Sequence, residues 1–355
     1  LPPVRSLAEE LGVSPTTVNA AYRNLRTRGL LVAGGRQGTR VSASPPVLRR
    51  LITTIPLGVM DLASDIPDPT QVPSLAPILE SIDGSALGGD AINHPKVVEA
   101  MKAGFTADKV DAARVAVVGT CLTGLERALD AHVRFGDSVV VEDPGPTEVL
   151  DLCRTLGLNP IPVGVDSEGP VQAGFEEALS KRVQAVIVSS RAQDPTSAAI
   201  SKKRAVQLKK VLATRPDVVV IEYDRAGDAA GVEFHSIRHA KTTSWACIRS
   251  FTALHGASLS VAGVAGDGET IGRIEGRLRV GGQWVASMIQ HAFVGFQAGG
   301  QNFIVDAIHG TYQSRREALV EALTAVGIEA WGASGNHVWI PVPEEYPVAQ
   351  SLRDL

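Results

Sequence analysis

The fold is constrained most by a regular alternation of apolar runs and amphipathic segments, which begins near residue 60 and continues through most of the chain. The apolar runs in ARVAVVGT, DSVVVED, QAVIVSS and DVVVIEYD predict buried strands. Segments such as LTGLERALDAHV and TEVLDLCRTLG lie between them and have the spacing of helices. This βα alternation predicts an α/β domain with a mostly parallel sheet and helices on both faces.

Length and composition exclude several classes of protein. A chain of 355 residues, 44% of them hydrophobic, can bury a large core and is long enough for two or three domains. It has no run of about 18 apolar residues, so we expect no membrane span. Three widely spaced cysteines, Cys121, Cys153 and Cys247, lie among apolar neighbours. They predict buried thiols in a reducing cytoplasm, not disulfides or a metal site.

Charge is distributed unevenly along the chain. Residues 1–50 carry eight arginines, no lysine and two glutamates, a formal charge of +6, whereas the whole chain carries −4. A small basic part in front of a larger acidic one predicts that the basic part meets a polyanion.

The basic part begins with two short amphipathic helices. VRSLAEELG places its apolar residues on one face and ends at Gly12, and VSPTTVNAAYRNLRTRGL follows it. Ser14 is placed to cap the second helix, and Pro15 lies in its first turn, where a missing N–H costs nothing. Two short helices joined by a tight turn predict a helix-turn-helix, whose second helix usually enters the major groove of DNA.

Two β-type runs, 30–33 and 39–42, follow around the basic, glycine-rich tip GGRQG. They predict a hairpin, and with the two helices they predict a winged helix. A solvated helix pair that binds another protein is the alternative, but it explains less well why arginines occur on both the helices and the hairpin. The residues that we expect to contact DNA are Arg5, Ser6, Ser14, Thr16, Thr17, Asn19, Arg23, Arg36, Gln37, Thr39 and Arg40.

The stretch LPPVRSLAEELGVSPTTVNAAYRNLRTRGLLVAGGRQGTRV resembles the DNA-binding domain of the GntR superfamily, starting after that domain's first helix. The resemblance implies DNA contacts by Arg5, by the residues from Thr16 to Asn19 and by the tip of the hairpin. One position departs from the family, because Asn19 stands where an arginine is often found. Asparagine prefers adenine to guanine, so the usual guanine contact is not expected here.

Four motifs follow in a fixed order: GDSVVVEDPGP, SSRAQDPTSAAIS, VVVIEYDRAG and RSFTALHGASLSVAGVAGD. Their succession resembles the fold-type I aminotransferases. With a winged helix in front, the whole chain resembles the MocR subfamily of GntR-type regulators. That resemblance implies a dimer and, in most members, pyridoxal 5′-phosphate (PLP) held by a lysine.

We expect four parts along the chain. Residues 1–43 form the winged-helix domain, without its first helix, and residues 44–58 form a stiff linker that begins with Pro45 and Pro46. Residues 59–310 form the aminotransferase-like large domain. Residues 311–355 begin a C-terminal α+β subdomain, and we expect further residues to be missing at both ends.

The positions that would hold PLP carry other residues. Ala253 replaces the Schiff-base lysine, and no lysine follows Lys241. Tyr223 replaces the acid that pairs with the pyridinium nitrogen, and a phenol with a pKa near 10 cannot take that role. The remaining replacements are Asp194 for an asparagine, Pro146 for a stacking aromatic residue and Ser260 for a phosphate-binding arginine. We therefore expect no bound PLP and no other cofactor.

The cleft left behind has two interpretations. It is either a pocket for another small-molecule effector or a filled space in a domain that only dimerises. In the second interpretation, the side chains of Tyr223 and Arg225 occupy the space. A local ion pair between Arg191 and Asp224 would favour this second interpretation. The expected pocket residues are Cys121, Asp194, Tyr223, Arg225, Ser250, Thr252 and His255.

His337 and Trp339 alternate along GNHVWIPVP near the end of the chain. This spacing predicts a strand of the C-terminal subdomain. We expect a packed tryptophan and a hydrogen-bonded histidine there, with no ligand role for either.

We expect a DNA-binding transcriptional regulator that is not an enzyme. It would bind double-stranded operator DNA as a homodimer in the bacterial cytoplasm, associated with the nucleoid. Two other functions stay open: a PLP-dependent aminotransferase or PLP-sensing regulator, and an interaction scaffold. The missing lysine argues against the first, and the charge of +6 on residues 1–50 argues against the second.

Overall fold

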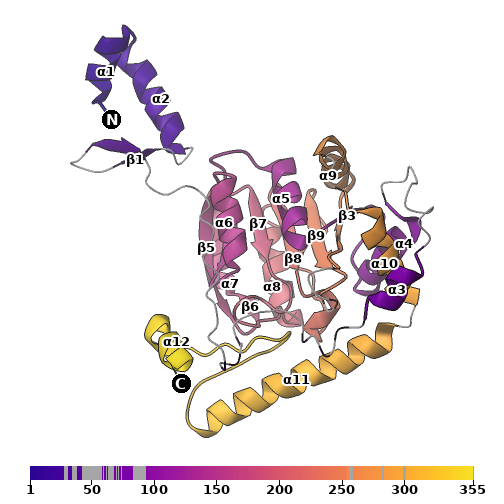
Figure 1. Cartoon of the computed structure of the whole chain (residues 1–355). Helices are drawn as coiled ribbons and strands as arrows, with labels where there is room; N and C mark the ends of the chain where they lie inside the picture. Colours follow the sequence, from indigo (N-terminus) through magenta and orange to yellow (C-terminus); the bar gives the residue numbers. More distant parts are fainter. Residues whose placement is uncertain are drawn as a thin grey trace.

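In a computed structural model, the protein consists of a small N-terminal unit and a large α/β body (Figure 1). The structure describes residues 1–27, 31–33, 38–41, 58, 60, 62, 68, 70, 72, 74–82, 93–253, 255, 259–281, 284–298 and 301–354. Nearly all of the expected linker at 44–58 lies outside the described residues, and so does the hairpin tip with Arg36 and Gln37.

The N-terminal unit has the predicted helix-turn-helix and the two strands of a wing. Its elements are α1 (Val4–Leu11), α2 (Pro15–Thr27), β1 (Leu31–Ala33) and β2 (Thr39–Val41), the strands being antiparallel. Gly12 ends α1 in the left-handed conformation, with φ of 64°, which turns the chain into α2. Ala8, Val18, Tyr22 and Leu31 form a small buried core between the helices and the wing.

The body is built on one eight-stranded sheet with the order β3-β10-β9-β8-β7-β4-β5-β6. The strands are β3 (Val115–Val118), β4 (Ser138–Asp143), β5 (Asn159–Asp166), β6 (Gly169–Pro170), β7 (Ala185–Val188), β8 (Val219–Asp224), β9 (Trp245–Ser250) and β10 (Ala262–Gly266). The run β9-β8-β7-β4-β5 is parallel, as predicted. β10 pairs antiparallel with both of its neighbours, because only a short segment joins it to β9 and a parallel return needs a long crossover.

Helices cover both faces of this sheet (Figure 1). One face packs against α5 (Cys121–His132), α6 (Thr147–Thr155) and α9 (Gly268–Gly281), through side chains such as Leu125 and Ile274. The other face packs against α4 (Pro95–Ala107), α7 (Gln172–Ser180) and α8 (Lys202–Leu212), through side chains such as Phe105 and Leu208. The two buried clusters are separated by the sheet, since Val220 and Ile221 of β8 point into different ones.

The remaining helices lie toward one end of the sheet and in the C-terminal part. They are α3 (Ala76–Glu80), the short η3 (Gly227–Ala230), α10 (Ser287–Ala298), α11 (Gln301–Ala325) and α12 (Glu345–Asp354). α11 runs without a break across residue 310, where the sequence suggested a domain boundary, and passes along the body in Figure 1. Beyond it Trp331 and Trp339 form an isolated antiparallel bridge. None of the helices in the described part of the chain is long and apolar enough to cross a membrane.

Candidate functional site

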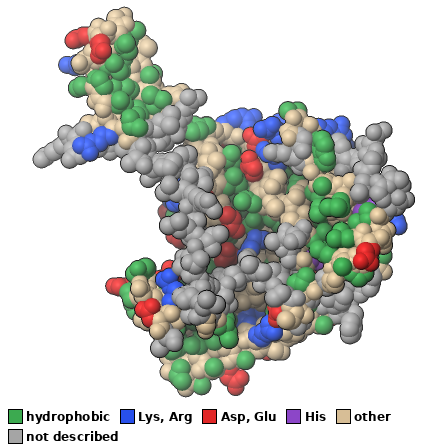
Figure 2. Space-filling model, in the orientation of Figure 1, with side chains coloured by type: hydrophobic (Ala, Val, Ile, Leu, Met, Phe, Trp, Pro, Cys, Tyr) green, Lys and Arg blue, Asp and Glu red, His purple; other side chains and the backbone are tan. Residues whose placement is uncertain are grey.

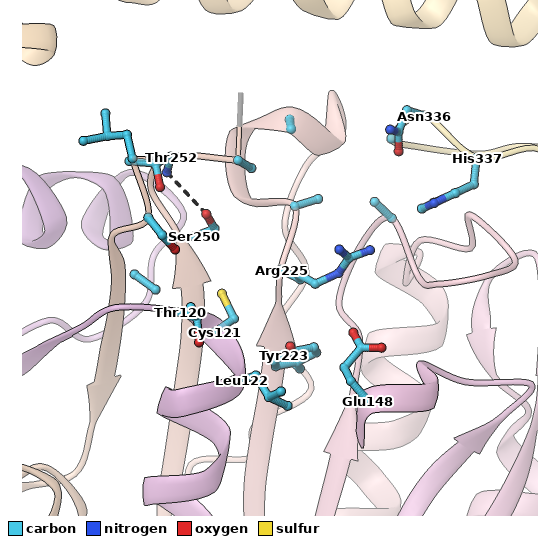
Figure 3. A pocket seen from close by; sticks show the side chains of 18 of the residues that line it. Thr120, Cys121, Leu122, Glu148, Tyr223, Arg225, Ser250, Thr252, Asn336 and His337 are labelled. Atoms are coloured by element: carbon cyan, nitrogen blue, oxygen red, sulfur yellow. Dashed lines mark hydrogen bonds between the residues drawn. The ribbon is translucent and has the colours of Figure 1, made fainter. Parts of the chain in front are cut away.

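A cavity of about 460 Å³ lies where β8 and β9 end, beside the N-terminus of α5 (Figure 3). The carboxyl edge of an open α/β sheet is the usual place for a ligand in such folds. Segments far apart in the sequence form its walls: the start of α5, the first turn of α6, the residues after β8, the loop between β9 and β10, and residues 335–337.

The cavity brings together most of the residues expected in the pocket. Five of the seven line it: Cys121, Tyr223, Arg225, Ser250 and Thr252. Ala253 and Ser260, which the sequence resemblance places at the lysine and arginine positions of a PLP site, line it too. Asp194 does not line the cavity. It forms an ion pair with the lining residue Arg225, with 3.7 Å between Oδ2 and Nη2.

The seventh expected pocket residue, His255, lies elsewhere, and so does Pro146, which the sequence placed at a position of the PLP site. His255 is buried away from the cavity, with its ring 4.9 Å from the ring of Phe296 in an edge-to-face contact. Pro146 precedes α6 and borders a separate small space on the other side of Tyr223. The sequence placed both near the motif, but it could not show that the loop after Ala253 directs His255 into the packing with α10.

A segment of the C-terminal part closes one side of the cavity. The Ser334 hydroxyl accepts a hydrogen bond from Ala192 N–H at 2.8 Å, and the Ser197 hydroxyl donates to the carbonyl of His337 at 2.7 Å. Gly335 has φ of 67°, and a Cβ there would lie 2.7 Å from the Cβ of Ala192, so a glycine is required for this close approach. These contacts hold His337 against the cavity.

The N-terminal unit exposes the side chains that were expected to meet DNA. Arg5, Ser6 and Arg40 are exposed, and Figure 2 shows basic side chains on the surface of the N-terminal unit. On α2, Thr16, Asn19 and Arg23 are exposed on the face away from the core. Ser14 caps α2 by accepting from Thr17 N–H at 3.1 Å, and its hydroxyl also contacts that of Thr17 at 2.8 Å.

Known proteins resemble both parts of the chain. Residues 1–41 match the gntR family of bacterial regulatory proteins. PtsJ of Salmonella typhimurium, a vitamin B6 salvage pathway transcriptional repressor, is 33% identical over 345 residues, which cover 96% of this chain and 80% of that protein. The chain belongs to the MocR subfamily of GntR-type transcriptional regulators. YjiR, an uncharacterized HTH-type transcriptional regulator of Escherichia coli, is 28% identical over 266 residues, 65% of this chain and 56% of that protein.

The body of this MocR-type regulator has the fold of aminotransferases. An archaeal alanine:glyoxylate aminotransferase superposes with a TM-score of 0.73 at 18% identity, over 81% of this chain and 76% of that one. A double mutant of Thermus thermophilus aspartate aminotransferase gives a TM-score of 0.71 at 17% identity, over 96% and 86%. The α/β fold expected from the sequence is confirmed, and these likenesses show the fold alone.

The wall of the cavity that is formed by the start of α5 and the segment between β9 and β10 has its hydroxyls hydrogen-bonded to the backbone. The Ser260 hydroxyl donates to the carbonyl of Gly119 at 2.5 Å. The Thr252 hydroxyl accepts from Val261 N–H at 2.9 Å, and the Thr120 hydroxyl caps α5 by accepting from Thr123 N–H at 3.0 Å. Among the described residues that line this wall, none is a cation, and residue 253 is an alanine.

Tyr223 and Asp224 lie on opposite faces of the sheet, because successive residues of a strand alternate. Tyr223 is at the floor of the cavity, where burial raises the pKa of its phenol well above the usual range. It therefore stays neutral and does not balance a pyridinium charge. Asp224 is fully buried on the other face, paired with Arg191 and Arg249, so this acid is not available to the cavity either.

Cys121 offers no reactive group to the cavity. Burial, with Asp224 as a second cause, raises the pKa of its thiol well above the usual range, so the thiolate that reacts as a nucleophile is not formed. No group of three or more His, Cys, Asp or Glu side chains in the described ranges is arranged to hold a metal ion.

Several lining residues were not anticipated from the sequence, and three of them are polar side chains from separate segments. Glu148 in the first turn of α6, Tyr312 of α11 and Asn336 all line the cavity. His337 lines it too, and its Nδ1 is buried without a hydrogen-bond partner among the described residues, whereas the sequence predicted a hydrogen-bonded histidine. A first-turn glutamate is a common helix-stabilising residue, so its sequence position gave no signal of a ligand role.

Proposed function

We propose that this regulator binds operator DNA as a homodimer and that its body takes a small-molecule effector without catalysing a reaction and without PLP as a covalent cofactor. The observation that carries the proposal is a cavity of about 460 Å³ kept open at the ligand edge of an aminotransferase fold, with Ala253 at the lysine position. Arg191 does pair with Asp224, which was expected to favour a purely dimerising domain, but Asp224 lies on the other face of the sheet from the cavity. Tyr223 and Arg225 line the cavity without filling it, and this favours the effector.

Loss of catalysis follows from the chemistry of the lining. Transamination needs an amine that forms a Schiff base and then moves a proton, and Ala253 supplies neither. The Cys121 thiol and the Tyr223 phenol stay protonated in their buried positions. The alternative, a PLP enzyme or PLP sensor, is tested by adding PLP to the full chain, reducing with borohydride and measuring protein mass. A stoichiometric adduct at one site would contradict the proposal.

The DNA-binding proposal is tested on the arginines of the N-terminal unit. If about six phosphates are neutralised, the logarithm of the binding constant should fall with the logarithm of salt concentration at a slope near −5. Arg5→Ala and Arg40→Ala should each weaken binding to all sequences and make the slope less steep by about 1, as measured by fluorescence anisotropy. Asn19→Ala should instead change which sequence is selected from a random pool.

Lys202→Ala, at an exposed position on α8, is the matched control for the loss of one positive charge. It should leave both affinity and salt slope unchanged. Equal losses in the control and in the arginine variants would mean that the N-terminal unit is not the DNA-binding surface.

The name of the relative PtsJ suggests the first compounds to test as effectors. PtsJ of S. typhimurium is named for vitamin B6 salvage, so vitamers of B6 are the first compounds to test for binding and for an effect on DNA affinity. The dimer is tested by light scattering of the full chain, since two winged helices in one dimer would read a two-part operator.

A further inference from the structure

We infer that the effector carries an amine and no phosphate, and that Glu148 is the carboxylate that binds the amine. The inference rests on the proposed function, since it names the class of ligand for the same cavity. Its basis is the charge left unbalanced among the described side chains that line the cavity.

The cavity lining has two formally charged side chains within the described part of the chain, Arg225 and Glu148. Arg225 is already opposed by Asp194, with 3.7 Å between the charged atoms. Glu148 is half-buried and forms no ion pair or hydrogen bond with any described residue. Figure 3 shows its carboxylate directed into the cavity beneath Arg225. Among the residues that the structure describes, the site therefore carries one negative charge that its own side chains do not neutralise.

Glu148 occupies a helix position at which acidic side chains are favoured. It lies in the first turn of α6, where the partial positive charge of the helix N-terminus stabilises an anion. A partly buried carboxylate without a partner is costly, and an ammonium group with charge-assisted hydrogen bonds removes that cost. An amine is thus the group that complements this wall.

A phosphate does not complement the opposite wall. A phosphate monoester carries about −1.5 to −2 charges at pH 7, whereas the start of α5 offers only about half a positive charge. The arginine position there is Ser260, whose hydroxyl is held by Gly119. A second anion near Glu148 would also be repelled. An uncharged hydroxyl fits this wall better, as it can form a hydrogen bond with Ser250.

Three B6 vitamers test the effect of the amine and the effect of the phosphate separately. Pyridoxamine and pyridoxine differ only in an amine and a hydroxyl, and pyridoxamine 5′-phosphate adds only the phosphate. Isothermal titration of the full chain should show that pyridoxamine binds about tenfold or more tightly than either of the other two vitamers. Pyridoxine lacks the charge-assisted contact of the amine, and pyridoxamine 5′-phosphate adds repulsion between its phosphate and Glu148. Glu148→Gln should bring pyridoxamine to the affinity of pyridoxine.

Glu177→Gln, at an exposed glutamate of α7 paired with Lys181, is the control and should leave all three affinities unchanged. The inference is wrong if the phosphorylated vitamer binds as tightly as pyridoxamine, if Glu148→Gln keeps the preference for the amine, or if none of the three binds. Operator binding by the same samples, followed by anisotropy, tests the proposed function separately. A chain that binds operator but shows no preference for the amine refutes only the ligand class.

Discussion

Replacing Asp224 should destabilise the body more than any surface charge substitution, because this carboxylate joins two buried arginines. It is 0% exposed, and Arg191 and Arg249 are 5% and 1% exposed. Its oxygens accept from Arg249 Nε at 2.6 Å and from Arg191 Nε at 3.0 Å. Asp108 also contacts both arginines, at 2.8 Å and 3.2 Å, so two positive and two negative charges balance.

The magnitude follows from what truncation leaves behind. At an effective dielectric constant of about 20, the attraction between two opposite charges 3 Å apart is about 5 kcal/mol. The lost hydration of each buried ion opposes this attraction by several kcal/mol. Asp224→Ala removes the attraction but leaves both arginines buried against Asp108 alone. We expect the free energy of unfolding to fall by about 3–5 kcal/mol, and Asp224→Asn, which keeps the volume, to lie in the same range.

Urea denaturation followed by tryptophan fluorescence measures this loss in the body, because all four tryptophans lie outside residues 1–50. Asp217→Ala is the matched control: Asp217 pairs with Arg215 at 2.9–3.0 Å but is 65% exposed, so its loss should cost less than about 1 kcal/mol. A similar, small cost for Asp224→Ala and for the control would refute the reasoning.

The stability difference between the native protein and Asp224→Ala should depend on pH in a defined way. Burial alone would raise the pKa of Asp224, but Arg249 and Arg191 outweigh it and hold the pKa below the usual range. A depressed acid pKa contributes stability above the unfolded value, near 4, that is lost as pH falls through the folded value. The difference between the native protein and Asp224→Ala should therefore be constant near neutral pH and narrow only in acid.

Two further predictions concern the carboxyl edge of the sheet. Installing the missing amine by Ala253→Lys should not create a PLP site: after borohydride reduction, peptide mass spectrometry should find no more adduct at position 253 than at the exposed Lys202, and selective, stoichiometric labelling of 253 would contradict this. Burial raises the pKa of Glu142 to about 7 from 4.5, so its native contribution to stability is lost as pH rises between these values. Glu142→Gln should therefore gain about 3 kcal/mol relative to the native protein between pH 5 and pH 8 in urea titrations, and a pH-independent difference would count against a buried, titrating Glu142.

Several features of the fold were predictable because they depend on local sequence. Hydrophobic period and β-type runs indicated the parallel strands, and Gly12 with Ser14 and Pro15 marked the turn and start of α2. The antiparallel return of β10 was not predicted, since it depends on the length and path of a connection and not on the period of the strand itself.

The candidate site was predictable only in part. The motif order located Cys121, Tyr223, Arg225 and Ser250 at one edge of the sheet, because parallel strands of an α/β sheet end together. His255 lies five residues beyond Ser250 but points into a different core, since the path of a loop is set by long-range packing and not by distance along the chain.

The family, the basic N-terminal unit and the alanine at position 253 follow from residue identity and order alone. Only the tertiary structure decided which side chains share the cavity. Glu148 comes from α6 and His337 from a segment almost two hundred residues later, and neither position has a local signal of its role. Their approach depends on hydrogen bonds between the C-terminal segment and residues 192–197. The unbalanced carboxylate of the cavity is therefore a property of the assembled fold, because charge balance depends on which groups meet in space.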